Sequence, residues 1–473
     1  MSGAIRDHIA GDAGGFVAAV LTGDRQGLSP AVNQWMRDTS LYHLVSISGV
    51  HMALLAAFVF ALVRGVVALV PPVALRVSSK KLAALVALPV AAFYLALAGR
   101  DIATERAFIT VAVSLIAVLL DRRAISLNTV ALAATLVLVL RPEAVLNAGF
   151  QMSFAAVVGL VVMFDTLRLA RARWPGLRRW RALGWLLLPM GVSLVAGLAT
   201  GPYAAASFNR IAHYSLPANM LAEPAMSFLV MPAGILALIL WPVGLGPAAL
   251  WVAEQGTRWI LWVAEVIAAW PYAVSAAVTP QPAVMPLLTL GAIWIVLWRG
   301  WGRWLGAPVV VLALTLWGAT QRPALLISSD GAAVAVLGPE GRVFSKPRGA
   351  GYAASNWLLS DGEMVAQAEA FERPGFTRQD GRLVAEVGGQ RILHLTTAAA
   401  GRHLTTAAAV RAAADCGGAD IVIAAHDLPP ITGCRVFDRR ALRDSGAVAG
   451  WPTAQGLRLE SVAESSGQRL WIR

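Results

Sequence analysis

A ten-residue string with two histidines, two serines and a glycine stands at the start of a long apolar run. It reads HLVSISGVHM and extends from His43 to Met52. The run from Leu44 to Val63 holds twenty residues without Lys, Arg, Asp or Glu, enough to cross a hydrocarbon layer of about 30 Å. Polar groups are costly there unless they meet a partner helix or water. Two interpretations stay open: His43 and the serines cap a helix end at the lipid headgroups, or the string faces a polar interior.

Polar residues also stand near the starts of later apolar runs. A charged pair precedes the run that begins at Ala107, two amides open the run from 145 to 164, and a polar, proline-containing stretch at 207–228 is typical of a broken or re-entrant segment. Amides more often bond between helices than serve a ligand. Candidate groups for a translocation pathway are Ser48, Gly49, His51, Glu105, Arg106, Asn147, Gln151, Asn209, Arg210, His213, Asn219 and Glu223.

The composition indicates a membrane protein. Hydrophobic residues make up 57% of the 473 residues and charged residues only 14%, which is too little charge for a soluble protein of this size. The 17 Trp agree, because indole favours the headgroup boundary. The net charge of +12 could attract nucleic acid, but in a membrane protein it first indicates basic cytoplasmic loops.

Apolar runs predict about ten membrane helices between residues 43 and 321. They cover 44–63, 82–98, 107–120, 127–140, 145–164, 183–206, 229–240, 248–270, 287–298 and 305–321. The basic loops 64–81, 121–123, 165–182 and 299–303 fall on one side, and the positive-inside rule makes that side cytoplasmic. Both termini are then expected outside, in the periplasm or cell exterior, of a multi-pass bacterial inner-membrane protein.

Residues 1–42 predict an amphipathic approach to the bundle, with short helices on the membrane surface. Ile5, Ile9, Phe16, Val20 and Leu21 fall near helical spacing. The segment lacks the compact apolar core and cleavage site of a signal peptide. Glu254 and Arg258 are one helical turn apart, and this spacing predicts an ion pair inside the 248–270 helix.

Residues 322–473 predict a soluble α/β domain. Short apolar runs in 324–345 are separated by Asp-Gly and Glu-Gly turns, Gly388-Gly389 interrupts a second pair of runs, and 419–425 reads as a buried strand. A short helix is expected at 410–415. Cys416 and Cys434 lie in this domain, and they form one disulfide if it is outside the cytoplasm or remain two buried thiols if it is inside.

Three separated motifs resemble the ComEC competence family of inner-membrane DNA-uptake channels. They are the His43–Met52 string, RPEAVLNAGFQMSFAAVVGL from Arg141 to Leu160, and PANMLAEP from Pro217 to Pro224. The resemblance covers about residues 15–320. It implies a channel for single-stranded DNA in natural transformation, contact with the lipid bilayer, a DNA receptor and an ATPase as partners, and a capacity to oligomerise. No nucleotide-binding loop of the Gly-x-x-x-x-Gly-Lys-Ser/Thr type is present in this chain.

The resemblance also implies departures at both ends. Only about 40 residues precede the first run, so the outer domain of the family is expected to be lacking. The family's C-terminal metallo-β-lactamase-like domain needs a tight His-x-His-x-Asp-His cluster. After residue 321 the histidines are His394, His403 and His426, and no two lie within four positions of one another. We therefore expect a degenerate, non-catalytic domain without metal or other cofactor.

Two other functions stay open. A secondary transporter or permease for a small anionic or lipid-like solute could use the broken 207–224 segment as its site. An inactive, truncated relative would carry no transport at all. Loss of DNA uptake without loss of small-solute transport in a deletion strain would favour the channel.

Overall fold

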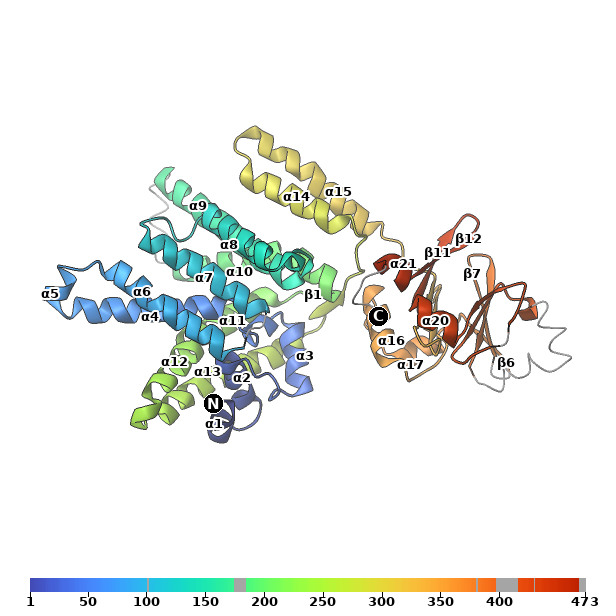
Figure 1. Ribbon diagram of the computed structural model, residues 1–473, viewed down its shortest axis with the longest axis horizontal. Helices are drawn as coiled ribbons and strands as arrows, with labels where there is room; N and C mark the ends of the chain where they lie inside the picture. Colours follow the sequence, from blue (N-terminus) through green and yellow to red (C-terminus); the bar gives the residue numbers. More distant parts are fainter. Residues whose placement is uncertain (100–101, 174–183, 380–381, 397–415, 429, 468–473) are drawn as a thin grey trace. The chain divides into compact units, whose positions relative to one another are not determined.

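A computed structural model describes residues 1–99, 102–173, 184–379, 382–396, 416–428 and 430–467. The chain divides into two compact units, Met1–Ser275 and Ala276–Arg473. The first unit is a helical bundle, and the second combines a helical hairpin with two β-sheets (Figure 1).

The first unit is built from helices joined by short turns. Long neighbouring helices pack in antiparallel pairs, as α4 and α6 do on either side of α5 (Figure 1). The elements are α1 Ser2–His8, α2 Gly11–Thr22, α3 Pro30–Asp38, η1 Tyr42–Leu44, α4 Gly49–Ala68, α5 Pro71–Ala74, α6 Ser79–Leu97, α7 Ile102–Leu119, α8 Leu127–Leu140, η2 Pro142–Leu146, α9 Ala148–Arg173, α10 Gly184–Phe208, β1 Arg210–Ala212, α11 Ser215–Ala225, the π-turn η4 Met226–Val230, α12 Met231–Leu240, η5 Trp241–Val243, α13 Gly246–Ala268 and β2 Val274–Ala276.

Six helical stretches in the described residues are long and apolar enough to cross a bilayer. They are Gly49–Ala68, Ser79–Leu97, Ile102–Leu119, Ala148–Arg173, Leu187–Phe208 and Ser215–Val243. Each has at least 18 residues and so reaches about 27 Å or more along its axis. This is a membrane protein by composition and helix length.

The sequence predicted about ten spans, and six helical stretches of the described residues have the length and composition of a span. Each of the ten predicted segments contains a helix in its described residues. However, α8 and α14 (Val284–Leu297) have 14 residues each and α15 (Gly306–Gly318) has 13, so they reach only about 20 Å. The 23 residues of α13 include Glu254, Arg258 and Glu265. The predicted ion pair is confirmed, with Arg258 Nη2 lying 2.7 Å from Glu254 Oε1.

The N-terminal segment differs from an amphipathic surface helix. Helix α2 is buried along nearly all its length, from Ala13 to Leu21. It packs with Ile5 and Ile9 against Ala233, Leu250 and their neighbours on α12 and α13. An all-round apolar helix is stabilised by burial on every side, whereas an amphipathic one needs a solvent face. The N-terminal segment is therefore part of the core of the bundle.

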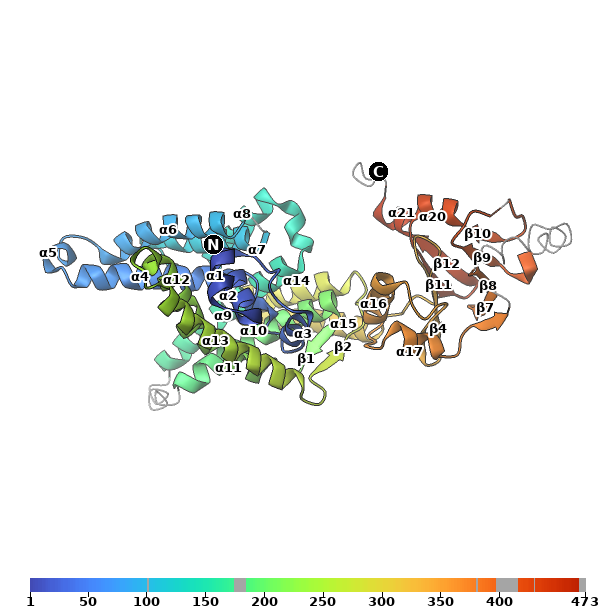
Figure 2. The same cartoon turned by 90° about the horizontal axis from the view of Figure 1, so that it is seen from below.

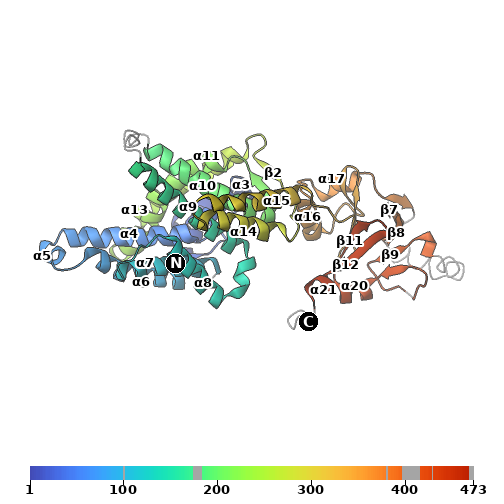
Figure 3. The same ribbon diagram turned by 90° about the horizontal axis from the view of Figure 1, so that it is seen from above.

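Helices α14 and α15 form an antiparallel hairpin in the second unit (Figure 3). Their backbones approach closely, because a Cβ on Gly306 would lie 2.5 Å from the carbonyl oxygen of Gly291. The 3-10 turn η6, Trp301–Leu305, closes the tip. At the base, the Trp317 indole donates to the Val278 carbonyl at 2.8 Å.

The remainder of the second unit is a two-sheet sandwich with helices (Figure 2). One sheet is antiparallel in the order β12-β11-β3-β4-β5, and the other is mixed in the order β10-β9-β8-β7-β6, with β8, β9 and β10 parallel. The elements are β3 Leu325–Ile327, β4 Val334–Gly338, β5 Gly341–Phe344, α16 Gly351–Ser360, α17 Gln367–Glu372, β6 Thr377–Gln379, β7 Arg382–Val387, β8 Gln390–Leu395, η7 Cys416–Gly418, β9 Ile421–Ala424, β10 Arg435–Phe437, α20 Arg439–Ser445, β11 Val448–Thr453, β12 Gly456–Ser461 and α21 Val462–Ser466.

Strand alternation explains how the sandwich packs. Val334 and Val336 of β4 join the core between the sheets, whereas Ala335 faces the opposite way with Leu358 of α16. The predicted turns are confirmed: Gly331, Gly341, Gly388 and Gly389 all have positive φ, which glycine adopts without strain. The expected helix at 410–415 lies outside the described residues.

A buried ion pair holds the edge of the antiparallel sheet. Arg342 is fully buried, and its Nε donates to Asp361 Oδ2 at 2.6 Å while Nη2 donates to the Pro323 carbonyl at 2.9 Å. Nearby, Arg373 contacts Glu363, which also accepts the Arg342 backbone N–H. Breaking such a pair by removing one partner is costly, so this network fixes the 361–363 turn onto β5.

The crossing of α2 with the loop before α3 predicts a sensitive glycine. A Cβ on Gly15 would lie 2.1 Å from the Gly27 carbonyl oxygen, so Gly15→Ala should destabilise the chain by roughly 1–3 kcal/mol. The measurement is thermal unfolding of the full chain in detergent. Gly3→Ala is the matched control, because a Cβ at Gly3 meets nothing within 4 Å. Equal unfolding temperatures for both variants would contradict the tight crossing.

Candidate functional site

His51 lies in the first turn of α4 and is fully buried. Its Nδ1 accepts a hydrogen bond from the Ser48 backbone N–H at 3.2 Å and lies 2.9 Å from the Ser48 hydroxyl. An accepting Nδ1 puts the ring proton on Nε2. In the described part of the chain, Nε2 is buried with no hydrogen-bond partner. His51 therefore caps α4 with one nitrogen and leaves the other as a buried polar group.

His43 and Glu223 lie at the same helix start. His43 Nε2 is 3.8 Å from Glu223 Oε2, so η1 and α11 meet through an ion pair when His43 is protonated. His43 Nδ1 lies 2.9 Å from the Ser40 carbonyl, which orients the ring. Gly49 has open space where a Cβ would lie, so no neighbour within 4 Å requires glycine there.

A second group forms where α7 and α9 begin and α8 ends. Glu105 Oε2 lies 3.3 Å from Nη2 of Arg141, and Arg106 is 8% exposed. The Arg106 guanidinium lies beside the α9 start, since a Cβ on Gly149 would be 3.3 Å from Nη1 and 3.4 Å from Nη2. A buried guanidinium in an apolar helix is rare and is stabilised by nearby polar groups.

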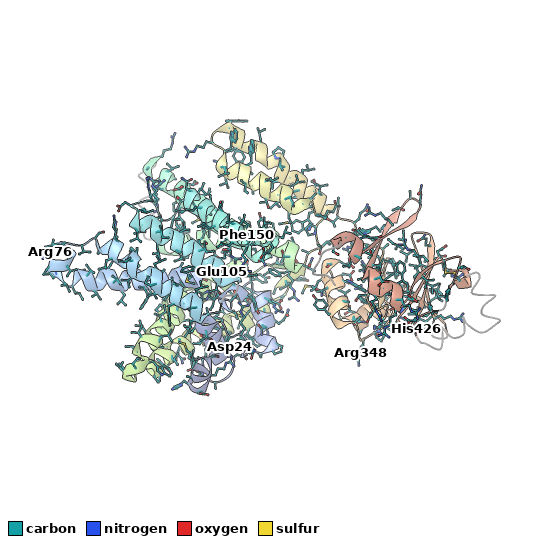
Figure 4. The ribbon with its side chains drawn as sticks, viewed as in Figure 1. Asp24, Arg76, Glu105, Phe150, Arg348 and His426 are labelled. Atoms are coloured by element: carbon teal, nitrogen blue, oxygen red, sulfur yellow. A yellow bond between two sulfur atoms is a disulfide. The ribbon has the colours of Figure 1, made fainter. Side chains whose placement is uncertain are left out.

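The two amides of this group fix the start of α9. Asn147 Oδ1 accepts the backbone N–H groups of Gly149 at 2.9 Å and Phe150 at 3.4 Å, and Gln151 Nε2 donates to the Val145 carbonyl at 2.9 Å. Figure 4 shows Glu105 and Phe150 in this part of the bundle. The geometry thus brings Glu105, Arg106 and Asn147 together and satisfies the α9 terminus with side chains.

The third group occupies the break after α10. Asn209 has a φ of +56°, and β1 and β2 follow as a two-stranded sheet. Arg210 Nη1 lies 2.9 Å from Asp38 Oδ1, and the same carboxylate accepts from Gln34 Nε2. His213 Nε2 lies 2.9 Å from the Ser275 hydroxyl. The chain is therefore broken here, as the sequence predicted, and its polar groups are anchored to α3 and β2.

Asn219 stands apart from these groups in its bonding. Its Nδ2 donates to the Ser215 carbonyl one turn earlier in α11, at 2.7 Å. Helix α11 then continues through the π-turn Met226–Val230 into α12. A π-turn inside a helix is often found at a functional position.

An open depression of about 460 Å³ lies elsewhere in the first unit. It is lined by Arg6, Ile9, Gly11, Asp12, Gln26, Gly27, Leu28 and Ser29. None of the sequence-predicted pathway residues lines it. Apart from Asn219, which lies within α11, the candidate residues lie in the three groups described above.

The charged partners of two candidate residues were not predicted from the sequence. Asp38 pairs with Arg210 across 172 positions, and Arg141 pairs with Glu105 across 36. Arg141 carried one usable signal, because a charged residue directly before a proline at the end of an apolar run needs a polar neighbour. Asp38 carried none, since it is the last residue of the polar helix α3, where a solvated carboxylate is ordinary.

The histidines of the second unit do not assemble a metal centre in the described residues. His394 shares the inner face of β8 with Ile392, and its Nε2 lies 3.1 Å from the Gly331 carbonyl of the β3–β4 turn. It therefore joins the two sheets. Burial lowers the pKa of His394 to about 4, so the ring is neutral at pH 7. His403 lies outside the described residues.

The structure joins Cys416 and Cys434 by a disulfide. The bond connects η7 to the segment before β10, and Cys416 packs with Leu393, Leu395 and Val422 on the outer face of the mixed sheet. It closes a loop of 18 residues, so the two halves of this face are held together independently of hydrogen bonds.

A sequence model of the competence protein family matches residues 20–302, which include all three groups of polar side chains. The chain belongs to the competence protein family. The matched range runs from α2 to the tip of the α14–α15 hairpin, so it covers the bundle and ends before the two-sheet sandwich.

Curated relatives of this competence-family chain agree with that assignment. It is 29% identical over 290 residues to competence protein ComA of Neisseria gonorrhoeae, 27% over 229 residues to ComE operon protein 3 of Bacillus subtilis, and 24% over 243 residues to the uncharacterized protein YcaI of Escherichia coli. The alignments cover 61%, 48% and 51% of this chain but only 39%, 27% and 31% of those proteins. No solved structure matches.

His394 gives the second unit a predicted pH dependence. Its folded pKa of about 4 lies below the usual 6.5, so the unfolded chain takes up the proton first as pH falls. Its stabilising effect is complete above pH 6.5 and is lost between pH 6.5 and 4, by roughly 3 kcal/mol. Between pH 6.5 and 4, the free energy of unfolding should fall less for His394→Gln than for the wild type. His426→Gln is the matched control. Parallel pH profiles for wild type and His394→Gln would contradict this role.

Proposed function

We propose that this chain passes single-stranded DNA across the bacterial inner membrane during natural transformation. The observation that carries the proposal is the competence-family match over residues 20–302, which covers most of the first unit. One relative is named competence protein ComA, and another is named ComE operon protein 3. The proposed DNA route uses the three polar groups at the helix starts and at the break.

Physical chemistry explains why such groups suit a polyanion. A strand carries one negative charge per nucleotide, and a phosphate entering a low-dielectric layer needs water or cations at every step. Arg106 and Arg210 are cations at the edges of apolar helices, and Asn147, His51 and His213 can donate or accept hydrogen bonds there. Each arginine can exchange its present contact for a phosphate oxygen.

The proposed conducting state must differ from this arrangement. Arg210 is held by Asp38 at 2.9 Å, and Glu105 is held by Arg141 at 3.3 Å. Opening a route requires these side chains to separate. The break at Asn209 and the π-turn at Met226–Val230 flank α11, so we expect α11 to move as the opening element.

For residues 322–473 of the second unit we propose a degenerate metallo-β-lactamase-like domain without catalytic activity. Two facing sheets with helices support the fold, and the scattered histidines support the lost chemistry. DNA would then be degraded or received by other components. The proposed partners are a DNA receptor outside the membrane and an ATPase that supplies energy, and self-association of this chain is a further expectation.

We propose that both termini lie outside the cytoplasm. The loops 64–81, 121–123, 165–182 and 299–303 hold most of the basic residues between helices, and the positive-inside rule assigns them to the cytoplasm. A disulfide in the second unit supports the same orientation, because an oxidising compartment maintains it.

A specific observation favours a second candidate, a transporter for a small anionic or lipid-like solute. The interrupted backbone from Phe208 to Ser215 resembles the discontinuous helices that form solute sites in secondary transporters. Arg210 would then bind the anion in place of Asp38. Solute uptake, measured beside DNA uptake in a deletion strain, separates the two candidates.

Replacing Arg106 should reduce DNA uptake. Arg106→Gln removes a buried cation beside the α9 start, and a barrier higher by about 1.4 kcal/mol lowers the rate tenfold. Transformation frequency of a deletion strain complemented with each variant is the measurement, with membrane levels checked by immunoblot. Arg348→Gln is the matched control because Arg348 is an exposed arginine of the second unit (Figure 4).

The outcomes of this experiment separate the alternatives. Normal DNA uptake by cells whose Arg106→Gln variant is correctly inserted would show that Arg106 has only a structural role. Normal uptake by the deletion strain itself rejects the channel proposal and leaves the inactive relative or the solute transporter. A defect shared by Arg348→Gln would point to charge in general and against a specific route.

The orientation predicts the reactivity of the two thiols. In intact cells Cys416 and Cys434 should resist an impermeant maleimide until an impermeant reductant opens the disulfide. Cys416→Ser is the control, because it leaves the half-buried Cys434 as a single thiol that should react without reduction. Failure of that variant to react in intact cells, with reaction after lysis, would assign the second unit to the cytoplasm.

A further inference from the structure

The tip of the α14–α15 hairpin concentrates tryptophan and arginine. The tip comprises residues 298–304 and reads WRGWGRW. Trp298, Trp301 and Trp304 are 50%, 91% and 60% exposed, far more than a large apolar ring in water would normally be. Indole rings with an exposed N–H suit the boundary between lipid headgroups and chains.

Contacts within the hairpin fix the conformation of the tip. Trp294 and Trp298 stack with centroids 4.5 Å apart, and the Trp294 indole donates to the Gly302 carbonyl at 2.9 Å. Gly300 has a φ of +74°, and a Cβ on Gly302 would lie 2.6 Å from Trp298 Nε1. The arrangement holds Trp301 and Trp304 outward on a rigid turn and does not depend on a flexible loop.

The charge of the tip is not balanced within the hairpin. Between Glu265 and Asp330 the chain contains no acidic residue, whereas Arg299 and Arg303 stand in the tip. Among the described residues neither arginine forms an ion pair, and Arg303 Nε is buried without a hydrogen-bond partner. A guanidinium in this state calls for an external anion with oxygen acceptors.

The length of the hairpin restricts where the tip can lie. Helices α14 and α15 rise about 21 and 20 Å, against about 30 Å for the hydrocarbon core. Two arginines and three exposed indoles ending inside hydrocarbon would be strongly unfavourable. The tip therefore needs headgroup phosphates brought to it.

We propose that this tip is a binding site for the headgroups of anionic phospholipids. The guanidinium groups of Arg299 and Arg303 bind the phosphate, and Trp298, Trp301 and Trp304 lie at the headgroup–chain boundary around it. The site depends only on membrane insertion of the hairpin, and it is independent of the proposed DNA route.

The test uses the full chain in nanodiscs of phosphatidylglycerol or of phosphatidylcholine with identical acyl chains. An environment-sensitive fluorophore is attached through Trp301→Cys, and the native cysteines are already joined to each other. The label should shift to shorter emission wavelength in phosphatidylglycerol and much less in phosphatidylcholine. A label at Ala454→Cys, in the exposed β11–β12 turn of the sandwich, should respond to neither lipid.

The matched variants decide between a site and general electrostatics. Detergent-solubilised protein with native side chains at 301 and 454 is titrated with short-chain phosphatidylglycerol, and Arg299→Gln with Arg303→Gln should weaken binding roughly thirtyfold, because each basic residue contributes about a factor of five at an anionic surface. Arg348→Gln should leave binding unchanged. Equal responses to both lipids, or equal losses in the tip and control variants, would overturn the proposal. A lipid-independent response that changes with protein concentration would instead assign the tip to a second copy of the chain.

Discussion

The constraint on which the first unit depends is that a polar group cannot enter hydrocarbon without a partner. Most of the polar candidates described above are placed where a helix begins or breaks, which is where backbone N–H groups also need acceptors. His51 satisfies α4 through Ser48, and Asn147 satisfies α9 through its own side-chain oxygen. The same side chains thus serve the helix ends and provide polar groups beside apolar helices, so their structural role and the proposed functional role overlap.

This overlap gives the competence-family bundle its stability and also its capacity for change. Ion pairs such as Arg210–Asp38 join elements that are distant in sequence, and each member can find another charged partner. On the proposed DNA route, a polyanion would compete for the arginines but not for the carboxylates. The contacts that hold this arrangement would then also be the contacts that a phosphate replaces.

Periodicity and composition predicted the helices well, because a membrane helix is encoded locally by an uninterrupted apolar run. Each of the ten predicted segments contains a helix in its described residues, and the turns at Gly331 and Gly388–Gly389 are where the dipeptides indicated. Partners were harder to predict, since Asp38 and Arg210 are brought together only by the packing of α3. The burial of α2 was missed because its apolar surface, read alone, suits a bilayer interface as well as a protein interior.

Strand alternation similarly marks His394 as an inward-facing residue of β8 once the register is known. The sequence supplied its position but not the turn of the opposite sheet that it contacts. A single buried histidine within a strand can thus join two sheets, and its presence there does not identify a metal ligand. The sequence does not show that two sheets, formed by distant segments, pack face to face around this residue.

The packing of α2 against α12 and α13 bears on how the chain is made. Helix α2 ends at Thr22, whereas its neighbours begin at Met231 and Gly246, so more than two hundred residues separate them. At a synthesis rate of about 5–20 residues per second, the face of α2 that meets α12 and α13 waits roughly 10 to 40 s before these partners exist. During biogenesis this face must be shielded by the insertion machinery or by lipid, and the first unit is complete only when its two ends meet.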